Sequence, residues 1–416
     1  MRARADLVEA ALDAAATDFV PMMEKTGRAL AAAEEAGEPE IVIRAHDQLS
    51  VGAATQGDMA ALRRHTMASL EVARRLGAPM LEGFPWSRLA IADLLTGDWD
   101  AALRGSTELL TLAQRIGEGR ELVSSLGAHA WILVHRGRLT DAHGYLERAQ
   151  ALARLSIEAD RHVFTMVVVA EAALALAEND AARAREVARQ LEDLAGGWFS
   201  LLASAILGEA RARSGDLDGT QRLVTAFRGV RSCSTDLPDI LAGWLEGLIR
   251  LAAGRDQEGA EALCSAAEGF AALGLPFHAA RSRLAASHAV AVRNVERAVP
   301  LARQALEVFD RLGAPVEARA ARVLLRSWGV TPGRGRPRRG IGGPLSAREL
   351  EVARLVASGL SSADVATRLF ISPRTVTTHL ERIYARLDLS SRVALTRYMA
   401  DSGLLAEAGA PAQQGF

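Results

Sequence analysis

Short polar breaks interrupt the apolar pattern of the first 328 residues at nearly regular intervals. They fall at Gly57-Asp58, Gly97-Asp98, Gly137-Arg138, Asn179-Asp180, Gly215-Asp216, Gly254-Arg255 and Arg293-Asn294. Successive breaks lie 36 to 42 residues apart, and each is followed by a helix-like run that contains small residues. Two helices per unit of about 40 residues are typical of a tetratricopeptide-like α-solenoid. We therefore expect residues 1–328 to form such an array, although the full tetratricopeptide consensus is absent.

Several of these units end on a glycine. The pentapeptide Arg-Leu-Gly-Ala-Pro occurs twice, at residues 75–79 and 311–315. Glycine adopts the left-handed conformation that follows a helix end, and proline cannot continue the helix. We therefore predict that helices stop before Gly77 and Gly313.

Three helix starts follow one another after residue 344. Each has a serine, a polar residue three positions later, and a flanking pair of apolar residues. The serines are Ser346, Ser361 and Ser372; the polar partners are Glu349, Asp364 and Thr375; the apolar pairs are Leu345 and Leu350, Leu360 and Val365, and Ile371 and Val376. The serine side chain accepts a hydrogen bond from a free backbone amide at the start of the helix, and the two apolar residues pack together across that start. Pro373 suits the first helical position. The pattern predicts helices over 348–357, 362–369 and 373–387.

The third of these helices is amphipathic. Its apolar side carries Val376, Leu380, Ile383 and Leu387, and its opposite side carries Arg374, Thr377, Thr378, Glu381 and Arg382. About three residues separate it from the second helix, where the small Ala366 permits a close crossing. This arrangement is typical of a DNA-recognition helix held by a partner helix.

With these residues in place, the stretch 345–405 resembles the LuxR-type (GerE-like) helix-turn-helix domain of bacterial transcription regulators. The resemblance rests on Leu345-Ser346-x-Arg348-Glu349, Gly359-Leu360-Ser361, Val365-Ala366, Ile371-Ser372, Thr375-Val376 with His379, Ile383, Leu387, Ser391-Arg392 and Gly403-Leu404. It implies a fourth helix over about 391–402, which mediates homodimerisation on a two-fold-related double-stranded DNA operator.

The resemblance also implies roles for single residues. Thr377, Thr378 and Glu381 would face the major groove, and Arg374, Thr375, Arg382 and Arg392 would lie near phosphates. The family commonly has lysine where this chain has Thr377, which would flatten the salt dependence by up to about one unit of slope if that lysine contacts a phosphate. Glu381 either accepts from a cytosine amine or pairs with a neighbouring arginine, and the sequence leaves both interpretations open.

Composition and charge agree with this division. The chain is 49% hydrophobic but only 5% aromatic, which favours packed helices. Its net charge is −1, yet residues 345–405 hold eight arginines against six acids, and residues 329–344 hold four arginines and no acid. The Gly/Pro/Arg composition of 329–344 predicts a linker, whose arginines either stay solvated or touch DNA. Residues 406–416 are expected to be a disordered tail.

Several function classes are disfavoured. Lys25 is the only lysine and follows no glycine-rich loop, so no nucleotide-binding P-loop exists in this sequence. The chain therefore resembles the C-terminal part of the large ATP-binding LuxR-type regulators without their nucleotidase. The N-terminal region also lacks the alternating strands and helices of a receiver domain, which disfavours two-component control.

Neither metal chemistry nor catalysis is indicated. Cys233 and Cys264 lie far apart, the nine histidines form no metal-ligand motif, and no nucleophile motif is present. Only His162, near Glu158 and Asp160, combines ligand types. We expect no enzyme activity, cofactor or metal.

No signal peptide or membrane span is indicated, because the apolar stretch 163–177 is short and contains Glu171. We therefore expect a cytoplasmic transcription regulator that is all-α and is controlled through its repeat domain by an effector or a protein. The six tryptophans either pack between helices or line an effector groove, and no effector-binding residue is named. Two alternatives remain: an interaction scaffold with secondary DNA binding, and an ATP-driven switch.

Overall fold

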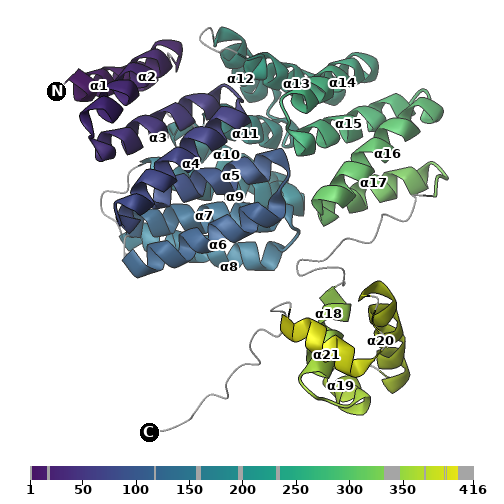
Figure 1. The fold of residues 1–416 in the computed structure, drawn as a ribbon. Coiled ribbons are helices and arrows are strands. Elements are labelled where there is room, and N and C mark those ends of the chain that lie inside the picture. The colour runs from purple at the N-terminus through teal and green to yellow at the C-terminus, as the bar shows by residue number, and fades with distance from the viewer. Residues whose placement is uncertain are drawn as a thin grey trace. The chain divides into compact units, whose positions relative to one another are not determined.

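The computed structural model describes residues 2–15, 19–116, 119–155, 161–194, 200–230, 235–331, 347–369, 372–387, 389 and 391–401. In these ranges every regular element is helical (Figure 1), as the sequence predicted. The chain divides into two compact units, Met1–Gly333 and Arg334–Phe416. The predicted linker lies outside the described residues from residue 332 onward, and the predicted tail lies wholly outside them.

The larger unit is built from successive antiparallel helix pairs. Its helices are α1 (Arg2–Ala15), α2 (Phe19–Ala36), α3 (Pro39–Thr55), α4 (Met59–Arg75), the short 3-10 helix η1 (Pro79–Leu81), α5 (Gly83–Thr96), α6 (Trp99–Ile116), α7 (Gly119–His135), α8 (Leu139–Leu155), α9 (Arg161–Glu178), α10 (Ala181–Leu194), α11 (Ser200–Arg213), α12 (Leu217–Gly229), α13 (Leu237–Ala252), α14 (Asp256–Ala272), α15 (Pro276–Ala291), α16 (Val295–Leu312) and α17 (Pro315–Ser327).

All seven predicted breaks fall between the two helices of a pair. Six of them contain a residue with positive φ, namely Gly57, Gly97, Gly137, Asn179, Gly215 and Gly254. The seventh uses Asn294, whose side chain accepts a hydrogen bond from the backbone amide of Arg297 at 2.9 Å. The repeat predicted from the breaks is therefore confirmed.

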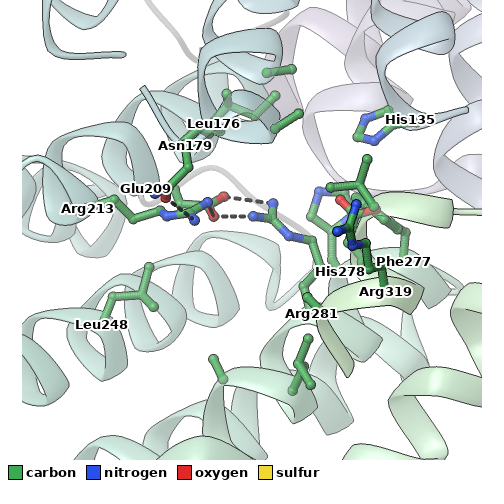
Figure 2. Close-up of a pocket in the computed structure, with 18 of the residues that line it drawn as sticks. His135, Leu176, Asn179, Glu209, Arg213, Leu248, Phe277, His278, Arg281 and Arg319 are labelled. Atoms are coloured by element: carbon green, nitrogen blue, oxygen red, sulfur yellow. Dashed lines mark hydrogen bonds and ion pairs between the residues drawn. The ribbon is translucent and has the colours of Figure 1, made fainter. Parts of the chain in front are cut away.

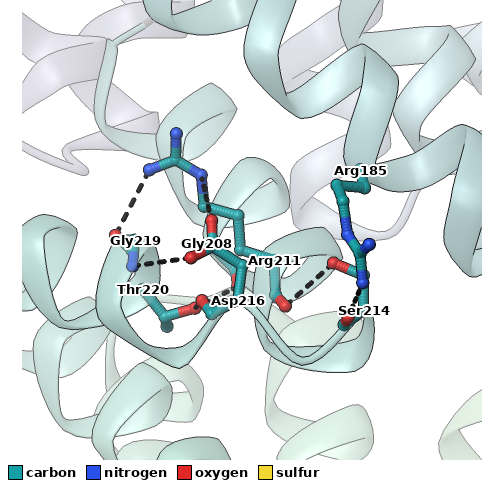
Figure 3. Close-up of polar contacts among 7 residues, drawn as sticks. All are labelled: Arg185, Gly208, Arg211, Ser214, Asp216, Gly219 and Thr220. Carbon is teal, nitrogen blue, oxygen red and sulfur yellow. Dashed lines mark hydrogen bonds and ion pairs between the residues drawn. The ribbon is translucent and has the colours of Figure 1, made fainter.

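The turn between α11 and α12 shows why a glycine and an aspartate stand together (Figure 3). Gly215 has φ of 84°, which ends α11. The Asp216 carboxylate accepts from the backbone amide of Gly219 at 2.9 Å and caps α12. Arg211 lies against this turn, with Nε 3.5 Å from Asp216 Oδ2 and a 3.2 Å bond to the Gly219 carbonyl. One residue thus stops a helix and the next starts another.

The predicted helix stops at Gly77 and Gly313 are also confirmed, with φ of 62° and 71°. The proline that follows has a second role, because Pro79 opens η1 and Pro315 opens α17. Proline suits this first position, where its missing N–H has no intrahelical partner to lose.

The array also packs against itself over a long separation in sequence. The first residues of α13, α15 and α17 pack on the turn glycines of earlier pairs: Leu237 on Gly57, Pro276 on Gly97 and Pro315 on Gly137. The glycines are 40 residues apart and the helix starts are 39 apart, so the two series stay in register. The missing Cβ permits this approach, since a Cβ on Gly97 would lie 3.1 Å from Pro276 Cγ and one on Gly137 would overlap Pro315 Cγ.

Other contacts also join the early helix pairs to α13 and α15. The Thr235 hydroxyl, just before α13, donates to the backbone carbonyl of Gln56 after α3. The ring of Phe277 on α15 meets Trp99 of α6 edge-on, with centroids 5.3 Å apart. The helices α3–α8 and α13–α17 therefore form neighbouring layers of one superhelix rather than the ends of an open rod.

The described residues of the smaller unit form four helices, α18 (Ala347–Ala357), α19 (Ser362–Arg368), α20 (Pro373–Leu387) and α21 (Arg392–Asp401). These agree with the predicted ranges to within one residue at each end. Its core is separate from that of the repeat unit and consists of Val352, Ala353, Val356, Val365, Ala366, Val376, Leu380, Ile383, Leu395 and Met399.

None of the described helices combines the length and apolarity that crossing a membrane requires. The apolar stretch singled out in the sequence belongs to α9, and residues 166–175 of that helix are all buried inside the array. Its low polarity therefore serves packing between neighbouring helices.

Candidate nucleic-acid interface

The entry to α20 is held by the predicted cap. The backbone amide of Thr375 donates to Ser372 Oγ at 3.1 Å, and the two side-chain hydroxyls are 2.8 Å apart. Pro373 occupies the first helical position, and Val376 is fully buried behind the cap. Its predicted staple partner, Ile371, lies outside the described residues.

The α19 entry forms a complete capping box. The Asp364 amide donates to Ser361 Oγ at 3.2 Å, and the Ser361 amide donates to the Asp364 carboxylate at 3.2 Å. A further hydrogen bond from the Ser361 hydroxyl, followed by the bond from its amide, lowers the pKa of Asp364. Leu360 and Val365 both join the core beside this cap. The first predicted cap, Ser346, lies outside the described residues.

The crossing of α19 and α20 leaves one side of α20 free. Val376, Leu380 and Ile383 turn toward the core, as their spacing predicted. Ala366 on α19 is only 4% exposed and packs with them, so its small side chain sets how closely the two helices approach. The polar side of α20 consequently faces away from the core of this unit.

Six of the seven predicted site residues lie on α20, on that outer side. They are Arg374, Thr375, Thr377, Glu381 and Arg382, which are exposed, and Thr378, which is half-buried. Except for Thr375, they stand at positions i, i+3, i+4, i+7 and i+8, so they form one stripe along the helix. The structure therefore brings together the surface that the sequence predicted.

The hydroxyls of this stripe are oriented by the helix backbone. Thr377 Oγ1 donates to the carbonyl of Pro373 at 3.2 Å, and Thr378 Oγ1 donates to the carbonyl of Arg374 at 3.1 Å. With their protons turned inward, both oxygens keep lone pairs for an external donor. Glu381 forms no ion pair with any of the side chains that the structure describes.

Arg392, the seventh predicted residue, is placed differently. It opens α21, and its guanidinium donates to the backbone carbonyl of Leu360 in the turn between α18 and α19. This bond ties the fourth helix to the start of the second and leaves the side chain half-buried. Arg392 thus has a structural partner within the unit.

One exposed apolar residue was not singled out from the sequence. Val393 on α21 is 79% exposed, whereas Leu395 and Met399 on the same helix are buried in the core. An apolar residue that is out of phase with the buried positions of its helix is a signal that periodicity analysis can detect. Here it marks an exposed apolar point on the helix to which the family resemblance assigns dimerisation.

Comparisons with known proteins agree with this geometry. Residues 343–399 match the family described as bacterial regulatory proteins, luxR family. The oxygen regulatory protein NreC of Staphylococcus haemolyticus is 43% identical over 61 residues, 15% of this chain and 28% of that protein. The resemblance of the C-terminal unit to LuxR-type domains is therefore confirmed.

A longer match extends into the repeats. A putative HTH-type transcriptional regulator of Mycobacterium bovis is 33% identical over 309 residues, which cover 73% of this chain and 32% of that protein. A putative HTH-type transcriptional regulator of Mycobacterium tuberculosis matches to the same extent. The chain thus spans about a third of the length of these relatives.

Proposed function

We propose, from the premise that residues 343–399 form a LuxR-family helix-turn-helix domain, that this chain is a sequence-specific DNA-binding transcription regulator. The observation that carries the proposal is the capped helix α20 with its outward stripe of arginine, threonine and glutamate side chains. The names of the relatives point to the same kind of function and to no catalytic one. A DNA-binding role places the chain in the cytoplasm, where bacterial DNA lies.

In the proposed complex, α20 lies in the major groove. Thr377, Thr378 and Glu381 contact base edges, while Arg374, Thr375 and Arg382 contact phosphates. We assign the exposed carboxylate of Glu381 to a cytosine amine, with pairing to a neighbouring arginine as the alternative. Arg392 contributes to phosphate binding from the start of α21, alongside its bond to Leu360.

The two kinds of contact predict different mutant behaviour. Thr378→Ala should change the order of preference among duplexes, with a loss of about 1–3 kcal/mol on the preferred site. Arg374→Ala should weaken all duplexes alike and reduce the salt slope by about one unit, because a phosphate contact carries no sequence information. Fluorescence anisotropy with the full chain, after selection of bound duplexes from a random pool, measures both.

The matched control is Arg326→Ala, an exposed arginine on α17 in the repeat unit. It should leave affinity and salt slope unchanged. Equal losses for Thr378→Ala and Arg374→Ala across the panel would contradict the assigned roles. If the full chain bound no duplex with a salt-dependent affinity, the alternative of a protein-interaction scaffold would replace this proposal.

We further propose that the chain binds its operator as a homodimer through α21. The exposed Val393 supports this, since an apolar side chain that is free in the monomer gains from burial between two copies. Val393→Asp should lower the cooperativity and affinity on a two-fold operator by about tenfold, equivalent to roughly 1.4 kcal/mol.

Val8→Asp supplies the control for this variant, because Val8 is also exposed, at 63%, but lies on α1 of the repeat unit. Gel shifts on a full operator and on a half-site separate a loss of dimerisation from a loss of DNA binding by a single copy. Similar affinities of Val393→Asp and the wild type on the full operator would exclude dimerisation through this surface.

A further inference from the structure

One turn of the superhelix surrounds a cavity of about 960 Å³ (Figure 2). The helices that line it are α7, α9, α11, α13, α15 and α17, the first helix of each successive pair. Pockets for small organic ligands commonly measure about 300–1,000 Å³. The cavity therefore has room for a ligand and does not consist of ordinary packing gaps, which rarely exceed a water molecule.

Most of the cavity wall is apolar. Trp131, Trp244 and Phe277 come from three different helices, and Leu248 and Leu284 add aliphatic surface. The sequence left two roles open for the tryptophans, packing and a groove lining. Trp131 and Trp244 do both, since each is nearly fully buried and also lines the cavity.

The charged groups of the cavity have an excess of arginine. Glu209 accepts two hydrogen bonds from Arg281, one of them at 2.7 Å, and also lies 3.6 Å from Arg213 (Figure 2). Arg319 is exposed toward solvent and forms no ion pair with another described residue. Together with Glu317, the lining holds three arginines against two glutamates.

Burial also shifts the pKa of three other titratable groups of the lining. Burial raises the pKa of Glu317, with Arg281 opposing. Burial lowers the pKa of His135 to about 3 and of His278 to about 4, so both rings are neutral at pH 7. At neutral pH the cavity is therefore apolar and carries a net positive charge.

Two buried polar atoms of the lining have no hydrogen-bond partner among the described residues. They are Nδ1 of His278 and Oε2 of Glu317. A buried polar atom without a partner costs about 1–3 kcal/mol, and native structures contain few of them. Both residues belong to the lining of the cavity.

We infer that this cavity binds a small organic anion with an apolar body. The acid group pairs with Arg319, assisted by Arg213, and the body lies against Trp131, Trp244 and Phe277. If the proposed function holds, this is the effector site of the regulator. The helix α17 would then transmit occupancy, because it supplies seven lining residues and precedes the DNA-binding unit in sequence.

The test uses the full chain and two fluorescent probes with the same aromatic framework. The anionic probe is 8-anilinonaphthalene-1-sulfonate, and N-phenyl-1-naphthylamine is its uncharged counterpart. We expect saturable binding of the sulfonate with 1:1 stoichiometry. Arg319→Gln should weaken that binding about five- to tenfold, in keeping with a partly exposed charge contact, and should leave the neutral probe unaffected.

Arg326→Gln is the matched control, because it removes the same charge from the same helix at an exposed position that does not line the cavity. It should change the binding affinity of neither probe. Hydrogen exchange with and without the sulfonate locates the site, and we expect slower exchange of amides in α15 and α17 but not in α2.

The inference is overturned if Arg319→Gln and Arg326→Gln affect sulfonate binding equally, or if protection appears away from the lining helices. It is also overturned if the uncharged probe binds as tightly as the sulfonate. A separate DNA titration distinguishes the two proposals, since failure to bind any duplex would remove the proposed regulator and leave the probe results standing.

Discussion

Replacing Val376 by aspartate should unfold the four-helix unit and abolish DNA binding while the repeat unit stays folded. Val376 is fully buried at the start of α20, against a core that shares no residue with the repeat core. Losing its apolar burial and introducing an unpaired polar group costs roughly 3–6 kcal/mol. A unit of about 60 residues has a total stability of only about 3–9 kcal/mol. Thermal unfolding followed by circular dichroism should therefore lose one transition and keep the larger one.

Thr377→Asp makes the same charge change at the next position, which is exposed. This variant should keep both transitions but still bind DNA at least tenfold more weakly, because the new carboxylate opposes the phosphates. The pair thus separates folding of the unit from its surface chemistry. Retention of DNA binding by Val376→Asp would refute the assignment of α20 as the recognition helix.

Gly137→Ala should destabilise the array strongly, because it combines backbone strain with a clash. The left-handed conformation at φ of 69° costs an alanine about 1–2 kcal/mol. The added Cβ would also overlap the ring of Pro315, and such overpacking costs about 1–3 kcal/mol. The repeat unit should lose about 2–5 kcal/mol in total, and its thermal midpoint should fall by roughly 4–10 °C if each kcal/mol costs about 2 °C.

Gly215→Ala isolates the backbone contribution. Gly215 occupies the equivalent place in another pair, has φ of 84°, and has no atom within 4 Å of an added Cβ. The free energy of unfolding should fall by only the share due to left-handed strain, about 1–2 kcal/mol. Equal shifts for the two variants would show that contact between the superhelical layers adds nothing to stability.

Local features of the chain were predictable because their causes lie within a few residues. A helix stop needs only a glycine or asparagine in the left-handed region, as at Gly97 and Asn179. A helix start needs a capping side chain within three residues, as at Ser361 and Ser372. The buried side of α20 follows from the 3.6-residue period of its apolar positions. These features predicted the repeat and the first three helices of the smaller unit, while the fourth followed from the family resemblance.

Long-range features were not predictable in this way. Nothing near Gly137 in sequence indicates that Pro315 will lie against it, since the contact depends on how much each helix pair rotates relative to the last. The bond between Arg392 and the Leu360 carbonyl likewise joins two helix ends that only the packing of α18 against α21 brings together. The hydrogen-bond partner of Arg392 is therefore known only from the folded unit.

The sequence by itself thus determined the breaks within the helix pairs, the first three helices of the smaller unit, the buried side of α20, and the similarity of that unit to the luxR family. Caps, stops and periodicity act over one to four helical turns, and the sequence contains all the information they need. Only the tertiary structure decided that the repeats close into a superhelix and that Trp131, Trp244 and Arg281 share a cavity. Those residues are more than 100 positions apart at their extremes, and small rotations summed over successive helix pairs bring them together.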